Sequence, residues 1–140
     1  MFGRPGHLYV YLAYGMHRCM NVVTGSEHEG SAVLLRAAEP LEGIADMRAL
    51  RGRDALHELC SGPGKLCQAF AVDRSLDGAD LTRGGDLWIA EGEPLSRRDI
   101  LAGPRVGIRV GVDRPWRFRV RGDPWVSRGR PATSPSHSGS

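Results

Sequence analysis

Hydrophobic and polar residues alternate over residues 7–13, which predicts a β-strand because side chains two positions apart share one face of an extended chain. One face of this strand holds Leu8, Val10 and Leu12, and the other holds Tyr9 and Tyr11. A second strand is predicted over residues 18–24, with the turn at Tyr14-Gly15-Met16, where glycine gives the backbone freedom to reverse. An apolar run over residues 32–37 predicts a third strand.

From residue 39 the spacing of the apolar residues changes to every third position, which predicts a helix from Glu39 to Gly52. Its inward residues would be Leu41, Ile44, Met47 and Leu50. A shorter helix is predicted to begin at residues 61–63 and to bury Leu66, Ala69 and Phe70. Short strands are predicted over residues 86–90, 105–112, 116–120 and 124–127. The sum is an α+β fold: a single domain of mainly antiparallel strands with a few short helices.

The length of 140 residues and a hydrophobic content of 41 % suit one globular domain with a real core. No run of about 20 apolar residues that could span a bilayer is present. The first residues lack the pattern of a secretory signal. The three cysteines, an odd number without zinc-binding spacing, are expected to be reduced and buried in a cytoplasmic protein.

The charge is distributed unevenly along the chain, although the net charge is only +3. Residues 1–96 carry thirteen acidic and nine basic side chains, whereas residues 97–130 carry ten arginines and three aspartates. A basic face of this kind attracts polyanions and suits nucleic acid. A solvated arginine-rich surface would give the same pattern, so charge alone leaves both interpretations open.

Two local patterns bear on binding chemistry. The stretch Ser61-Gly62-Pro63-Gly64-Lys65 is a glycine-rich helix start that either holds one phosphate or only caps the helix, and it lacks the full Walker pattern. All three tyrosines lie between residues 9 and 14, which fits either bases stacked on aromatic rings or an amphipathic strand with aromatic residues in the core. No zinc pattern includes the His-Glu pairs, and we predict no metal site.

Four blocks of the chain together resemble the alkyladenine (3-methyladenine) DNA glycosylase family. They are GHLYVYLAYGMHRCMNVV, AVLLRAAEPLEG, LCSGPGKLCQA and PWRFRVRGDPWVS, in this order. The resemblance implies that residues 1–128 are the C-terminal portion of such a glycosylase domain, and we expect residues 129–140 to be a disordered tail.

The resemblance implies base-excision repair without a metal or organic cofactor. Members of the family hydrolyse the N-glycosidic bond of alkylated or deaminated purines, such as 3-methyladenine and hypoxanthine, after flipping the nucleotide out of the duplex. The implied partner is damaged double-stranded DNA, with no membrane association. We expect a monomer of bacterial type, cytoplasmic and associated with the nucleoid during repair.

The resemblance also assigns roles to individual residues. In the base pocket, Tyr11 would stack on the flipped base, Asn21 would discriminate against the amino group of guanine, and Arg36 would hold a phosphate beside the nucleotide. In a β-hairpin inserted into DNA, Tyr14 would be the wedge, and Met16 and His17 would touch neighbouring nucleotides. Lys65 matches a residue close to DNA, whereas Arg119 and Arg121 are chosen as backbone contacts from the charge pattern alone. His17 departs from the tyrosine of the mammalian form, which puts its role in doubt.

One element of the family has no match in residues 1–140. Family members carry a Glu-x-Glu-Ala-Tyr segment upstream, whose second glutamate is the general base that activates water. We therefore assign no catalytic residue here and expect this chain by itself to be impaired in catalysis. The alternatives are a non-catalytic DNA-binding remnant that recognises damaged duplex, and a structural β-rich domain with no nucleic-acid role.

Overall fold

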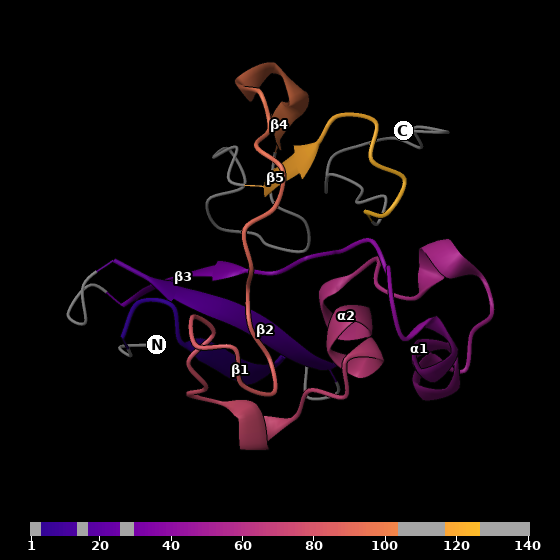
Figure 1. Ribbon diagram of the computed structural model, residues 1–140, viewed down its shortest axis with the longest axis horizontal. Helices are drawn as coiled ribbons and strands as arrows, with labels where there is room; N and C mark the ends of the chain where they lie inside the picture. The colour runs from indigo at the N-terminus through magenta and orange to yellow at the C-terminus, as the bar shows by residue number, and fades with distance from the viewer. Residues whose placement is uncertain (1–3, 14–16, 26–29, 104–116, 127–140) are drawn as a thin grey trace.

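The computed structural model describes residues 4–13, 17–25, 30–103 and 117–126. These residues form a small α+β fold, with strands and helices arranged as in Figure 1. The elements are strands β1 (Leu8–Ala13), β2 (His17–Thr24) and β3 (Ser31–Leu34), helices α1 (Ile44–Arg51) and α2 (Pro63–Ala69), and strands β4 (Ile100–Gly103) and β5 (Arg117–Val120). Single 3-10 turns lie at Leu56–Glu58, Arg74–Leu76 and Arg97–Asp99.

Strands β1, β2 and β3 form one antiparallel sheet in that order, which confirms the three predicted strands. The register joins Leu8 to Val22 and Ala13 to His17, so the first two strands pair along the whole of β1. The predicted turn at Tyr14-Gly15-Met16 lies outside the described residues. Strand β3 ends at Leu34, earlier than predicted, although the amide of Leu35 still donates to the carbonyl of Met20 at 2.9 Å.

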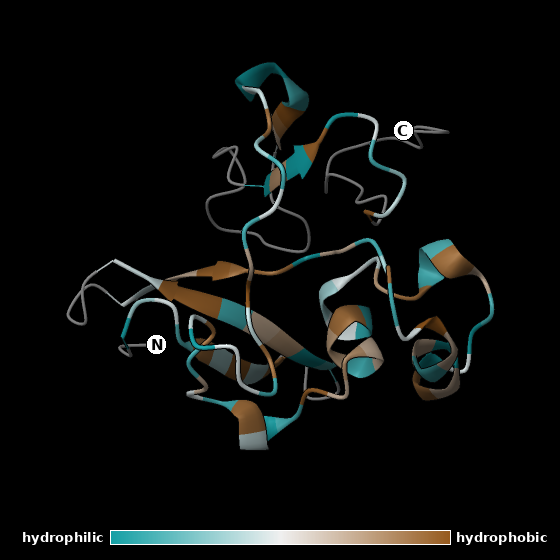
Figure 2. Cartoon of the chain, viewed as in Figure 1, coloured by the Kyte–Doolittle hydropathy of each residue, from teal (hydrophilic) through white to brown (hydrophobic). Residues whose placement is uncertain are grey.

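The core lies on the face of the sheet that carries Leu8 and Val10, as the alternation predicts. Met20, which pairs with Val10, packs there with α1, α2 and the segment between them. Leu59, between the helices, is fully buried. Figure 2 shows hydrophobic residues along the sheet and in parts of both helices, whereas the turn before β4 is hydrophilic and β5 alternates arginine with Phe118 and Val120. Cys19, Cys60 and Cys67 are free and buried, as predicted.

The outer edge of β1 is covered by the segment 76–80. The amide of Leu8 donates to the carbonyl of Ala79 at 2.8 Å, and the amide of Gly78 donates back to the carbonyl of Leu8 at 2.7 Å. Two residues further along β1, the amide of Val10 donates to the Asp77 carboxylate at 2.8 Å. These bonds pair backbone groups that an edge strand otherwise leaves exposed.

Helix α1 begins five residues later than the sequence predicts. Gly43 precedes it with a left-handed backbone (φ 68°), so the chain from residue 39 to 42 is not part of the helix. Of the predicted inward residues, Met47 is buried and Ile44 half-buried, but Leu41 and Leu50 are exposed. The helix is short, and its contacts with α2 and with the segment between the helices bury Met47 but leave Leu50 exposed.

Helix α2 begins at Pro63, as predicted, and buries Leu66 and Ala69. Phe70 is not inward: it ends the helix and is 42 % exposed, and Cys67 is buried instead. The first turn of α2 approaches β2 closely, because a Cβ atom built on Gly64 would lie 3.1 Å from the Cβ of His17. A glycine at this position therefore lets the helix rest against the strand beside the β1–β2 turn.

Strands β4 and β5 form a separate antiparallel pair. Residues 117–120 confirm the predicted strand there, whereas β4 was not predicted. The strand predicted over residues 86–90 is wrong: this segment is irregular, with one backbone bond from Ile89 to Leu81. The strand predicted from residue 124 is also wrong, because residues 124–126 belong to a turn in which the Trp125 amide donates to the Asp123 carboxylate.

Two further predictions lie outside the described residues: the strand over residues 105–112 and the disordered tail over residues 129–140. No helix in the described part of the chain is long and apolar enough to cross a membrane.

Replacing Asp77 with alanine should lower the free energy of unfolding by about 1–2 kcal/mol, because the Val10 amide loses its charged acceptor. Asp77→Asn keeps an oxygen at the same place and should lose less than half as much. Urea unfolding of the two variants beside the wild type measures both values. Equal losses in the two variants would show that charge, and not the hydrogen bond, stabilises the edge.

Gly64→Ala should be destabilising by roughly 1 kcal/mol, since the added methyl meets His17 and crowding outweighs the better helix propensity of alanine. In a His17→Gly background, where the contacted Cβ is gone, the same change should become neutral or stabilising. A double-mutant cycle by urea unfolding gives the coupling energy. Gly85→Ala, where an added Cβ meets nothing within 4 Å, is the control. No coupling between positions 64 and 17 would refute the contact.

Candidate nucleic-acid interface

The face of the sheet opposite the core carries two stacked tyrosine rings. Tyr9 and Tyr11 are both half-buried, and their ring centroids lie 5.5 Å apart with 27° between the ring planes. Asn21 pairs with Tyr9 across the β1–β2 ladder and therefore lies on the same face. It is 7 % exposed, and its Nδ2 makes a long hydrogen bond of 3.5 Å to the Tyr9 carbonyl. The sheet thus places an aromatic surface beside a buried amide.

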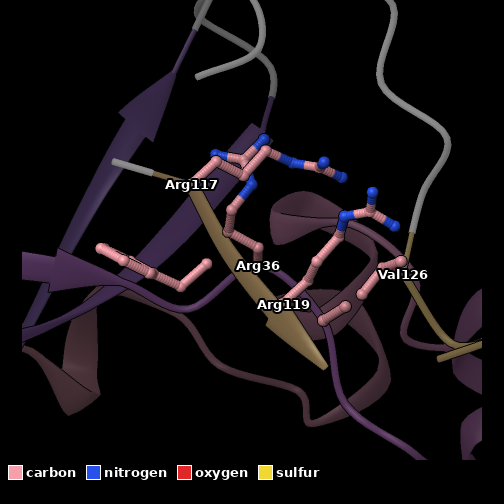
Figure 3. Close-up of a pocket in the computed structure, with 6 residues that line it drawn as sticks. Arg36, Arg117, Arg119 and Val126 are labelled. Carbon is pink, nitrogen blue, oxygen red and sulfur yellow. The ribbon is translucent and has the colours of Figure 1, made fainter. Parts of the chain in front are cut away.

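A cleft lined by three arginines lies where β5 meets the chain that follows β3. Arg117 and Arg119 are two positions apart on β5, so their side chains leave the same face of the strand. Figure 3 shows them beside Arg36, which belongs to the segment after β3. The lining is completed by Ala37, Phe118 and Val126, and none of the lining residues is acidic.

The electrostatics of this cleft reflect the crowding of like charges. The pKa of Arg117 is lowered, first by burial and then by the positive charges of Arg36 and Arg119. The buried Nε of Arg36 has no hydrogen-bond partner among the described residues. Burial raises the pKa of the Cys19 thiol, and the nearby charge of Arg36 partly offsets the rise. Since Cys19 pairs with Tyr11 on β2, Arg36 connects the cleft to the tyrosine face.

Two other predicted residues lie at the first turn of α2 and its neighbour on β2. The Nζ of Lys65 is 3.4 Å from the hydroxyl of Ser61, so the ammonium group stays over the start of the helix. The exposed His17 lies against Gly64 there. Arg121 behaves differently from the cleft arginines, because its Nε donates to the carbonyl of Arg98 at 3.0 Å. That bond secures the turn after β5.

The structure therefore brings Tyr11 and Asn21 onto one face, with Arg36 and Arg119 in the adjoining cleft. Tyr14 and Met16 lie outside the described residues. Sequence reasoning missed Arg117, although its position two residues before Arg119 in a predicted strand was a usable signal. Within the described ranges no three histidine, cysteine or acidic side chains gather as metal ligands.

Comparison with known proteins gives a consistent result. The family model described as Methylpurine-DNA glycosylase matches residues 1–124. A protein of Carboxydothermus hydrogenoformans is 50 % identical over 128 residues, covering 91 % of this chain and 67 % of its own length. A relative in Methanocella arvoryzae is 47 % identical over 135 residues, which cover 94 % of this chain and 66 % of the relative. A relative in Rubrobacter xylanophilus is 50 % identical over 123 residues, which cover 88 % of this chain and 63 % of the relative.

All three relatives are named provisionally as 3-methyladenine DNA glycosylases. The chain spans about two thirds of the length of these curated relatives. The match by the family model covers most of the 140 residues, and it agrees with the four sequence blocks that resemble the same family. On this evidence the chain belongs to the methylpurine-DNA glycosylase family.

Proposed function

We propose that this chain supplies the DNA-binding surface and most of the base pocket of a DNA glycosylase that removes alkylated or deaminated purines from duplex DNA. The observation that carries the proposal is the junction of the tyrosine face with the arginine cleft. An aromatic surface receives a purine ring, and the cations beside it hold the phosphate of the same nucleotide. Family membership supports this reaction class.

The tyrosine face and the arginine cleft each bind a different part of the extruded nucleotide. Tyr11 stacks on the flipped purine, because its ring is already stacked on that of Tyr9 and loses little freedom on binding. Asn21 meets the edge of the base from the adjoining strand and discriminates against guanine. Arg36 and Arg119 bind the backbone at the cleft.

The remaining proposed contacts with DNA lie on the β1–β2 hairpin and on the first turn of α2, which packs against β2. Tyr14 fills the gap that the flipped nucleotide leaves in the stack, with Met16 and His17 against the neighbouring nucleotides. Lys65 contacts the backbone beside His17, since the first turn of α2 rests against β2. Arg121 contributes mainly long-range attraction, because its Nε is already bonded to the Arg98 carbonyl.

Hydrolysis itself requires a general base, which we place in the Glu-x-Glu-Ala-Tyr segment of the family and not in residues 1–140. A positioned base contributes about 10²- to 10⁴-fold to such a reaction. On this proposal residues 1–140 serve recognition of the damaged nucleotide, and the family's Glu-x-Glu-Ala-Tyr segment activates water. A DNA-binding protein that recognises damage without base release would use the same surface.

Tyr11→Ala should weaken binding to a duplex containing one hypoxanthine by roughly tenfold, since stacking on an aromatic ring is worth about 1–3 kcal/mol per base. Binding to the undamaged duplex should change little. Tyr11→Phe keeps the ring and should bind like the wild type, and Phe70→Ala removes an exposed aromatic residue from α2 as the control. Fluorescence anisotropy with both duplexes measures the ratio. An equal loss for damaged and undamaged DNA would refute the pocket role of Tyr11.

Single-turnover release of hypoxanthine separates the glycosylase from a DNA-binding remnant. We expect the 140-residue chain to bind the duplex but to release base at least about 10²-fold more slowly than a form extended upstream to the next in-frame start. Gel analysis of abasic-site cleavage gives both rates. Full activity of the 140-residue chain would place the general base within it. Inactivity of both forms, with damage-specific binding kept, would favour the remnant.

A further inference from the structure

Tyr9 lies on the tyrosine face of the sheet, outside the cluster of buried residues that forms the core. Its neighbours along β1, Leu8 and Val10, point to the opposite face and belong to that cluster. Packing of the core therefore does not account for an aromatic side chain at position 9. The resemblance to the glycosylase family assigns no role to Tyr9 either, although its side chain is half-buried.

The ring of Tyr9 contacts the residue that is proposed to stack on the flipped base. Tyr9 and Tyr11 are two positions apart on β1, and their ring centroids lie 5.5 Å apart with 27° between the ring planes. Two aromatic rings at this separation attract each other beyond the effect of apolar burial alone. The ring of Tyr9 therefore restricts the orientations that the ring of Tyr11 can adopt.

Tyr9 is also the neighbour of Asn21 across the β1–β2 ladder. Residues directly opposite each other in an antiparallel pair lie closer together than residues on a diagonal. Asn21 is opposite Tyr9 but only diagonal to Tyr11, which is opposite Cys19. The carbonyl of Tyr9 accepts the long hydrogen bond from the Nδ2 of Asn21 at 3.5 Å. Tyr9 thus adjoins both residues proposed for the base pocket.

The backbone on either side of Tyr9 is held at the outer edge of β1. The amide of Leu8 donates to the carbonyl of Ala79, and the amide of Val10 donates to the Asp77 carboxylate, each at 2.8 Å. The side chain of Tyr9 therefore projects from a fixed point of the sheet. A side chain on a rigid element can hold its neighbours in the orientation that a ligand needs.

We propose that Tyr9 is a positioning residue of the base pocket, whose ring holds Tyr11 and Asn21 in place for the flipped purine without touching the DNA. This inference rests on the proposed function, because it needs Tyr11 to stack on the base. A ring that is already held in place loses less conformational freedom on binding. Tyr9 therefore strengthens binding of a damaged duplex more than binding of an undamaged one, in which no base enters the pocket.

Tyr9→Leu removes the ring but keeps an apolar side chain and the backbone carbonyl that Asn21 contacts. In the 140-residue chain we expect it to weaken binding to a duplex with one hypoxanthine by about three- to tenfold, the loss for one aromatic pair. Binding to the undamaged duplex should change by less than about twofold, because Tyr9 does not contact DNA. Fluorescence anisotropy with both duplexes measures the two affinities.

Two further variants control for the substitution itself. Tyr9→Phe keeps the ring and should bind both duplexes like the wild type. Phe70→Leu makes the same kind of change at an exposed position of α2 and should leave both affinities unchanged. A loss in Tyr9→Phe as large as that in Tyr9→Leu would overturn the role of the ring. An equal loss for both duplexes in Tyr9→Leu would overturn the positioning role.

A double-mutant cycle separates positioning through Tyr11 from a direct contact with DNA. If Tyr9 acts through Tyr11, most of the effect of Tyr9→Leu on the hypoxanthine duplex should disappear in a Tyr11→Ala background. Full additivity of the two changes would overturn the inference, because it would mean that Tyr9 acts independently of Tyr11.

Urea unfolding of each variant establishes that the fold is kept. If Tyr9→Leu does not fold, Tyr9→Ile makes the same test with a side chain that favours strands. Unchanged damage discrimination in Tyr11→Ala would refute the proposed base pocket, and this inference with it. Reduced discrimination in Tyr11→Ala, with none in Tyr9→Leu or Tyr9→Ile, would refute the positioning role alone.

Discussion

The pairing of β1 with β2 is the constraint on which the rest of the structure depends. Side chains alternate between the two faces of a strand, so this register decides at once which residues enter the core and which form the tyrosine face. A slip by one residue would bury Tyr9 and Tyr11 and expose Leu8 and Val10. The bonds from residues 77–80 to the edge of β1 hold that register from the outside. The core and the tyrosine face therefore both follow from one ladder of hydrogen bonds.

The arginine cleft is a different case, because it brings like charges together and none of its lining residues is acidic. The described structure satisfies Arg51 with three protein acceptors but leaves the Nε of Arg36 buried without one. Proteins rarely retain such a group without a use for it, since an unpaired buried donor costs about 1–3 kcal/mol. The proposed role of the cleft in holding the DNA backbone would give these cations a use that folding alone does not.

The sequence predicted the central sheet well because its alternation is a local signal that the tertiary structure does not contradict. The paired strands of residues 8–24 and the start of α2 at Pro63 are examples. The prediction from sequence failed where the structure of a segment depends on contacts with residues far away in the chain. Residues 86–90 have the composition of a strand but pair with no strand among the described residues, whereas β4 is a strand because β5 pairs with it. Phe70 was assigned inward by spacing alone, but α2 ends there.

The candidate site shows the same division between local and distant information. Tyr11 and Asn21 could be named from the resemblance, and their shared face follows from the strand register. For Arg117 the sequence held only its spacing from Arg119, because its other neighbour in the cleft, Arg36, lies 81 residues earlier in the chain. An excess of arginine after residue 97 indicates a polyanion partner but not a site. Only the convergence of separate segments brings these arginines together, and this is why the cleft depends on the fold while the basic character of the chain does not.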